Sequence, residues 1–461
     1  MQQLKNSVKN TLWVVCLLLF TAVSAVAQSG SINAFSPYTM YGLGEINTPG
    51  TLAQRSMGGV GVAARQTGMI NLLNPAGLSM VSRKSFLLHF GGEGQNYYNY
   101  QTLGGVDKTS AHNSFSIRDI AILIPLYKSL GFSVSVTPYS SVGYRMMYDH
   151  AFDENDPVWG NVGRVNYQYQ GEGDVTEVKF GLGNELFKNF SIGAAAQYYW
   201  GDIDRSFVMV PVAITGGGSF GEIVGQSKYS VSRFRAQVGM QWNAILTEKR
   251  ILTFGATYDF GGDLQPKVTE SIVGDDLYTT TVKGDTTHLA LSIPRKLTVG
   301  VHYQTVKWAL GFDYDYQQWA GSNSRSEMTG VNAATGTAFK VAYRDTHTFK
   351  AGIEYTPARY DVRRFWKRWS YRAGVRYGSF QQRFDNHDLQ EMALTCGVGI
   401  PFKFLGVSAV DVGLEYGLRG FNVDKQVGLV RQQYFKFAVA FRLFASGTEN
   451  NEYWFMRPKY D

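Results

Sequence analysis

The chain contains the alternating stretch KLTVGVHYQ at residues 296–304, followed by WALGFDYDYQ at residues 308–317. Every second residue is apolar, and most of the residues between them are charged, polar or glycine. Successive side chains of a β-strand point to opposite sides of a sheet, so this pattern predicts a hairpin with one apolar face and one polar face. The apolar set comprises Leu297, Val299, Val301, Tyr303, Trp308, Leu310, Phe312 and Tyr314.

The same alternation recurs along the chain, for example in residues 369–378, 410–419 and 434–444. Short connections alternate with long ones, as in outer-membrane barrels that have short periplasmic turns and longer outer loops. We therefore predict an all-β fold, a transmembrane β-barrel of about fourteen antiparallel strands over residues 85–444. A large soluble β-sandwich is the alternative, because its strands also alternate.

The N-terminus has the layout of a secretory signal peptide. Two lysines, Lys5 and Lys9, precede an apolar stretch at residues 12–23, and Ala25-Val26-Ala27 supplies the small residues of a cleavage site. We expect residues 1–27 to be removed, with an uncleaved anchor helix as the alternative. After this segment, no apolar run is long enough to span a bilayer as a helix. The predicted location is the outer membrane of a Gram-negative bacterium.

Composition agrees with a barrel wall and excludes several other classes. Glycine accounts for 51 of 461 residues and aromatic residues for 14%, although the mean hydropathy is only −0.17. Only Cys396 remains after cleavage, so no disulfide framework is possible. The net charge of +7 is spread along the chain without a basic stripe, which argues against nucleic-acid binding.

Residues 28–84 do not alternate, and they are rich in glycine and turn-forming residues. Side chains alone do not fill a barrel of this width, so we expect this segment to form a hatch that plugs the lumen. A disordered periplasmic tail is the alternative. Residues 445–461, beyond the last alternating strand, are expected to form a periplasmic C-terminal tail.

The sequence resembles the FadL-like family of outer-membrane transporters for long-chain fatty acids and other hydrophobic compounds. The resemblance rests on Gly42-Leu43-Gly44, residues 58–63 and Asn74-Pro75-Ala76 ahead of the first strand, and on the hairpin that follows Ile293-Pro294. It implies that Asn74, Pro75 and Ala76 belong to the hatch. The chain departs from the family pattern in an additional stretch at residues 48–51 and in its extension beyond Phe444.

Three further features are candidate working parts. Pro138 lies inside a predicted strand, residues 132–144, where it would cause a kink; the resemblance implies lateral release of ligand at such a kink, and a tolerated bulge is the alternative. An apolar run near a predicted outer loop is a candidate ligand-docking loop, unless the strand simply continues there. This run includes Phe207, Val208, Met209, Val210 and Ile214.

Charged residues recur on the polar faces of the strands and in one basic connection. The face charges, which include Arg235, Asp313, Asp315 and Lys350, are expected to pair across the lumen or with the hatch backbone; a polar pore for hydrophilic solutes is the rival interpretation. The connection at residues 358–368 is basic and is expected to face solvent or lipid headgroups, with a partner site as the alternative.

The sequence contains no His-Glu-x-x-His zinc motif and no Walker-type phosphate loop, so we predict no enzyme activity, cofactor or metal. A calcium site at Asp153, Glu154 and Asp156 is a weaker alternative to a solvated acidic loop. We expect a monomeric passive transporter of hydrophobic small molecules such as long-chain fatty acids. Its expected partners are this ligand, outer-membrane lipids and, during insertion, the barrel-assembly machinery. The alternative is an adaptor barrel that docks a protein partner, for example in secretion.

Overall fold

The computed structural model describes residues 34–66, 68–81, 87–103, 105–127, 129–151, 162–213, 220–247, 249–273, 279–282, 291–320, 327–331, 338–359, 361, 363–384, 387–403, 407–423 and 429–445. The expected signal peptide, residues 1–27, and the tail after residue 445 lie outside the described residues. The same holds for Asp153, Glu154, Asp156 and Ile214. No described helix is long and apolar enough to cross a membrane.

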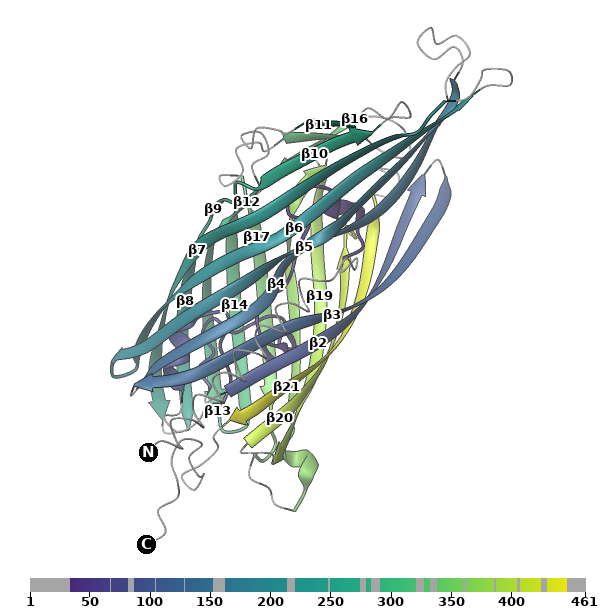
Figure 1. Ribbon diagram of the computed structural model, residues 1–461. Coiled ribbons are helices and arrows are strands. Elements are labelled where there is room, and N and C mark those ends of the chain that lie inside the picture. Colours follow the sequence, from purple (N-terminus) through teal and green to yellow (C-terminus); the bar gives the residue numbers. More distant parts are fainter. Residues whose placement is uncertain are drawn as a thin grey trace, which may run out of the picture.

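Fourteen antiparallel strands form a closed barrel, which confirms the predicted fold class (Figure 1). Each pairs with the next in chain order, and β21 pairs with β2 to close the ring. They are β2 (Leu87–Leu103), β3 (Val106–Tyr127), β4 (Leu130–Ala151), β5 (Val162–Phe187), β6 (Phe190–Ala213), β7 (Ile223–Thr247), β8 (Arg250–Phe260), β13 (Arg295–Thr305), β14 (Trp308–Gln318), β17 (Thr346–Tyr355), β18 (Ser370–Phe384), β19 (His387–Lys403), β20 (Val407–Arg419) and β21 (Arg431–Ala445).

The alternating side chains face as the sequence predicts. Trp308, Leu310 and Phe312 point outward and are 44%, 42% and 49% exposed, whereas the intervening Asp313 and the nearby Asp315 are buried. Exposed apolar side chains on the outside and buried charges on the inside are the reverse of a water-soluble sandwich. The sandwich alternative is therefore wrong.

The strands differ in length, and the longest extend the wall on one side. Strands β4 to β7 have 22 to 26 residues, whereas β8, β13 and β14 have 11. A membrane-spanning strand needs about 9–11 residues, so the long strands project beyond the bilayer at the upper end of Figure 1. This explains why β4 is longer than the predicted strand at residues 132–144. Short strands add to the same end: β9 (Gly262–Asp263), β10 (Lys267–Val273), β11 (Thr279–Val282), β12 (Ser292–Ile293), β15 (Glu327–Val331) and β16 (Ala338–Tyr343).

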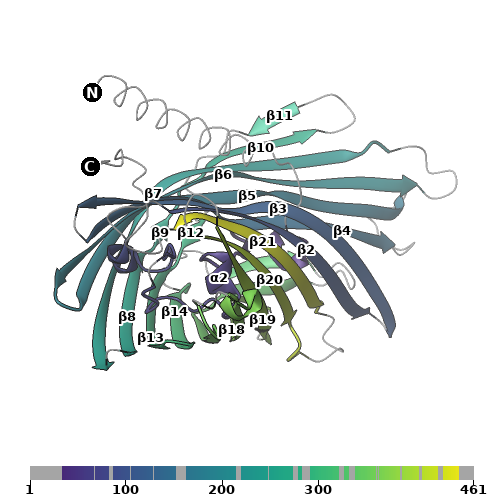
Figure 2. The ribbon, with the colours of Figure 1, turned by 90° about the horizontal axis from the view of Figure 1, so that it is seen from below.

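Residues 34–81, here called the N-terminal segment, lie within the ring of strands (Figure 2). The segment contains η1 (Pro37–Met40), β1 (Glu45–Ile46), α2 (Leu52–Arg55) and η2 (Pro75–Met80). Most of its side chains are buried, although its secondary structure is short and sparse. Contacts with the barrel wall therefore hold it in place.

Candidate functional site

Glycines of the barrel wall form the seat of the N-terminal segment. A Cβ atom added to Gly374 would lie 2.2 Å from the backbone nitrogen of Gly58, and one added to Gly352 would lie 2.3 Å from the carbonyl oxygen of Met57. A glycine inside a strand commonly marks a place where another backbone approaches closely. The glycines on the lumen face therefore allow the backbone of the segment to touch the wall.

Asp313 fastens the glycine-rich part of the segment to β14. Its Oδ2 atom accepts hydrogen bonds from the backbone nitrogens of Gly61 at 2.7 Å and Val62 at 3.0 Å. A carboxylate that accepts two backbone N–H groups binds them more strongly than a neutral acceptor does. Asp313 thus confirms that a lumen charge meets the backbone of the segment.

Replacing Asp313 with asparagine is expected to loosen this attachment. The amide oxygen can still accept a hydrogen bond but carries no charge, so we expect a loss of about 1–3 kcal/mol in the free energy of unfolding. Urea unfolding of the folded barrel measures the change. Thr298→Val, also a buried lumen position, is the control for polarity alone; an equal or larger loss in that variant would contradict a special role of the carboxylate.

Asn74, Pro75 and Ala76 are brought together against β5, β6 and β7. The Asn74 Oδ1 atom accepts from the backbone nitrogen of Ala76 and caps η2, while its Nδ2 atom donates to the carbonyl oxygens of Val62 and Met240 at 2.8 and 3.1 Å. Pro75 lies so close to Gly193 that an added Cβ would be 2.3 Å from its carbonyl carbon. Asn74 therefore links the segment to itself and to the wall.

Buried ion pairs tie the segment to two further parts of the wall. Arg55 of α2 pairs with Asp119 of β3 at 2.8 Å and with Glu93 of β2 at 3.4 Å. Glu45 of β1 pairs with Arg419 of β20 at 3.1 Å. Isolated buried charges are very costly, so these pairs specify how the segment sits.

The wall charges also pair with one another, as expected. Lys350 pairs with Asp315 at 2.6 Å, and Arg372 pairs with both Glu354 and Asp411 at 2.6 Å. Arg376 pairs with Glu415 in the same way. These lumen charges thus compensate one another. Arg235 differs, because it donates to the carbonyl oxygens of Phe234 and Asp263.

The wall has a break between β3 and β4. These strands pair from Tyr127 and Leu130 up to Ile120 and Val136, and no further pairing joins them among the described residues. Beyond that point β3 pairs with β2 and β4 with β5, so the β2–β3 hairpin diverges from β4 and β5 (Figure 1).

The N-terminal segment bridges this break. In β1, Glu45 pairs with Ser141 and Ile46 with Ser140, on the edge of β4 that β3 has left. Asn47 continues the contact by donating its backbone N–H to the carbonyl oxygen of Tyr139. On the other side, the Nη1 atom of Arg118 in β3 donates to Oδ1 of Asn47 at 2.7 Å. The segment thus fills part of the wall as well as the lumen.

Pro138 lies directly above the last pair between β3 and β4. The register between β4 and β5 shifts between Pro138 and Ser140, as at a β-bulge. Proline has no backbone N–H to donate to a neighbouring strand, which suits a position where pairing on one side has ended.

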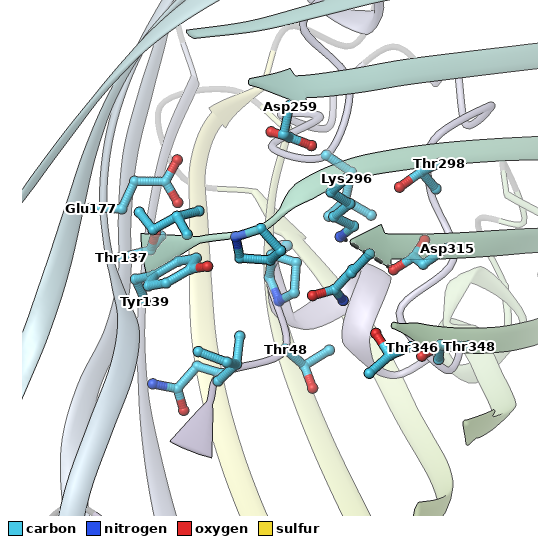
Figure 3. A pocket seen from close by; sticks show the side chains of 18 of the residues that line it. Thr48, Thr137, Tyr139, Glu177, Asp259, Lys296, Thr298, Asp315, Thr346 and Thr348 are labelled. Atoms are coloured by element: carbon cyan, nitrogen blue, oxygen red, sulfur yellow. Dashed lines mark ion pairs between the residues drawn. The ribbon is translucent and has the colours of Figure 1, made fainter. Parts of the chain in front are cut away.

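A cavity of about 190 Å³ lies between the segment and the wall, next to the break. Figure 3 shows Thr137, Tyr139 and Glu177 on one side of it and Lys296 and Asp315 on the other. Lys296 pairs with Asp315 at 3.2 Å. The apolar surfaces of Pro49, Pro138, Tyr139 and Trp319 complete a lining that is both charged and apolar.

The apolar run from Phe207 to Val210 lies within β6, which continues to Ala213, so the expectation of a loop at these residues is wrong. Phe207 pairs with Tyr169 of β5 and Gly225 of β7, because the long strands continue together beyond the membrane. Phe207 is 36% exposed.

Among the described residues, no three His, Cys, Asp or Glu side chains are grouped to hold a metal.

Several residues of this site were not predicted from the sequence, namely the wall glycines, Glu45, Arg55 and the β1 pairing. The glycines left a signal, since Gly352 and Gly374 occupy lumen-face positions of alternating strands. The two-residue strand β1 left none, because its pattern is too short to read.

The BamG family model matches residues 8–461, nearly the whole chain. The chain belongs to the BamG family. No curated protein sequence matches it.

Solved structures similar to this BamG-family chain are FadL-like barrels. A FadL homologue from Pseudomonas aeruginosa has 13% sequence identity, with 88% of this chain and 100% of that chain covered and a TM-score of 0.57. The toluene transporter TbuX of Ralstonia pickettii has 15% identity, coverage of 86% and 98%, and a TM-score of 0.52. The monoaromatic hydrocarbon channel CymD has 15% identity, coverage of 87% and 100%, and a TM-score of 0.57. The resemblance to FadL-like outer-membrane barrels is confirmed at the level of the fold.

Proposed function

We propose that this BamG-family barrel lets hydrophobic small molecules, such as long-chain fatty acids, cross the outer membrane of a Gram-negative bacterium by passive diffusion. The N-terminal segment acts as the hatch, and the ligand leaves sideways between β3 and β4. The observation that carries the proposal is the break in the wall with a cavity directly behind it. Neither the hatch nor the lateral exit requires a metal, a cofactor or an enzyme reaction. In this proposal the barrel works as a monomer.

The site supports this route in several steps. Met209 and its neighbours in β6 offer apolar side chains beyond the membrane, where a ligand could first be captured. The mixed lining of the cavity suits an amphipathic molecule, with Tyr139 and Trp319 for its chain and lysines for a polar end. Pro138 marks the point where β4 separates from β3, which opens toward the bilayer. The names of the similar structures, a FadL homologue and hydrocarbon channels, favour the same ligand class.

A disulfide between β1 and β4 tests the lateral route. Asn47 and Tyr139 form a hydrogen-bonded pair, so the adjacent pair Ile46 and Ser140 is the closer kind, which suits a disulfide. Ile46→Cys with Ser140→Cys, in a Cys396→Ser background, is expected to abolish uptake of a labelled fatty acid when oxidised. Reduction should restore uptake, because the segment can again move away from the break.

The control places the same bond where no gate is proposed. Asn96→Cys with Asn113→Cys joins β2 and β3, which are already paired, and is expected to leave uptake unchanged in both redox states. Full uptake by the oxidised β1–β4 variant would show that the ligand does not leave through this break.

A second candidate function is an adaptor barrel that docks a protein partner. The membership of the BamG family favours it, because that name connects the chain with the barrel-assembly (Bam) machinery. A pull-down of the intact barrel, performed beside fatty-acid uptake in the deletion strain, separates the two functions. Unchanged uptake together with a stoichiometric partner from the assembly machinery would favour the adaptor over the transporter.

A further inference from the structure

The longest described connection at the periplasmic end joins β17 to β18 and contains η3 (Phe365–Arg368). The other described turns at this end are much shorter, for example between β13 and β14. Figure 1 shows the connection projecting below the ends of the neighbouring strands. We call residues 359–368 the basic turn, because they include five cationic side chains and one carboxylate: Arg359, Arg363, Arg364, Lys367, Arg368 and Asp361.

Asp361 uses its charge inside the turn. Its Oδ1 atom accepts the backbone N–H groups of Arg363 and Arg364, both at 2.8 Å, and Lys367 lies 3.8 Å from its Oδ2 atom. The backbone hydrogen bond from Arg364 lowers the pKa of Asp361. Among the described residues, no carboxylate lies within ion-pair distance of Arg359, Arg363 or Arg364, all of which are exposed. Within the described part of the turn, Arg359 and Arg363 thus have no carboxylate in ion-pair contact, and Arg364 interacts with Asp361 only at longer range.

Two exposed aromatic side chains lie among these cations. Phe365 is 45% exposed and Trp366 is 52% exposed, in a turn that is otherwise mainly charged. Arg368 lies over the ring of Phe365 at 4.9 Å, and Lys367 lies over the ring of Trp366 at 5.8 Å. Cations next to Trp and Phe are the combination found where proteins meet the headgroup region of a membrane.

The basic turn contacts the outward face of the barrel. The hydroxyl of Tyr371 donates to the carbonyl oxygen of Trp366 at 3.2 Å, and Phe365 meets Trp369 edge-on with ring centroids 5.8 Å apart. Tyr371 faces outward because its neighbour Arg372 points into the lumen. With Trp308 and Tyr355 it marks the aromatic girdle at the periplasmic interface. The turn therefore lies at the level of the lipid headgroups.

From this position and composition, we propose that the basic turn binds the anionic headgroups of phospholipids in the periplasmic leaflet. The cations attract the phosphates, and the exposed rings enter the interface beside the girdle. A protein partner is less well supported, because the turn lies against lipid-facing side chains. This site is independent of the proposed transport, so failure of one proposal leaves the other standing.

The experiment compares lipid selection by full-length variants in nanodiscs of mixed phosphatidylglycerol and phosphatidylcholine. Native mass spectrometry counts the lipids that the released barrel retains. Wild-type protein is expected to retain phosphatidylglycerol preferentially. Changing Arg359, Arg363 and Arg364 together to glutamine should reduce that preference by about tenfold or more, because each cation near an anionic membrane surface adds to the binding free energy and three are removed. Trp366→Ala should cause a smaller loss.

The matched control removes the same charge at the opposite end of the barrel, by changing Lys108, Arg145 and Lys267 to glutamine. This variant should select lipids as the wild type does. The inference is overturned if the periplasmic variant, with its barrel folded, keeps the full preference, or if the control loses as much. Unchanged lipid selection together with loss of a co-purifying acidic protein would also overturn it, and would assign the turn to protein docking.

Discussion

Replacing Gly374 with valine is expected to open the lumen. The first added carbon would lie 2.2 Å from the backbone of Met57 and Gly58, a distance at which one of the two must move. Strand β18 is hydrogen-bonded on both sides, to β17 and β19, whereas Gly58 belongs to a short irregular segment. The segment should therefore give way, and a barrel of this width has a wide interior without it.

Sensitivity of cells to a large hydrophilic antibiotic such as vancomycin measures the opening. Heat-modifiable migration of the barrel in gels shows that it still folds. Gly94→Val is the control, because an added Cβ there lies 3.9 Å from its nearest neighbours and outside the seat. If a folded Gly374→Val barrel excludes the antibiotic as well as the wild type does, then the wall glycines do not hold the N-terminal segment in place.

Replacing Arg419 with methionine is expected to cost about 3–5 kcal/mol in the free energy of unfolding. The guanidinium lies between two carboxylates, at 3.1 Å from Glu45 and 2.9 Å from Glu391, and its side chain is 2% exposed. Glu391 also pairs with Arg376, but among the described contacts Glu45 has no second cation. The substitution thus leaves a buried carboxylate uncompensated, and this is the source of the cost.

Urea unfolding gives the magnitude, and two variants test the cause. Arg383→Met removes a pair whose two side chains are 43% and 42% exposed, so its cost should stay within about 1 kcal/mol. Combining Arg419→Met with Glu45→Met should recover much of the loss, because no isolated charge then remains at that position. Equal costs for Arg419→Met and Arg383→Met would show that the buried pair has no special weight.

The sequence was informative wherever the repeat of two residues extends through a whole strand. The hairpin at residues 296–317 has its predicted faces, since a membrane on one side and a packed lumen on the other require opposite side-chain chemistry. Charge pairing in the lumen was also predictable in kind, because a plugged interior does not tolerate isolated charges. The pattern did not predict which partners meet, as Arg372 reaches residues of two different strands.

The break in the wall and its bridge could not be read from the chain. Residues on both sides of the break still lie in regular strands, so the alternation of β3 and β4 continues without a sign that their pairing ends at Ile120 and Val136. Pro138 was the only local hint. The pairing of Ile46 with Ser140 joins positions far apart in the chain, and two residues carry no periodic pattern. Likewise, the strand at Phe207 looked like a loop because its apolar residues lie beyond the membrane.

The bridge by β1 has a consequence for the order of assembly. The N-terminal segment contacts the closing strands themselves, since Gln432 of β21 donates to the carbonyl oxygen of Phe35, as does Asn99 of β2. The seam between β2 and β21 joins the first and last strands of the wall around this peptide. We therefore expect the N-terminal segment to lie inside the wall before β2 and β21 pair and close the barrel.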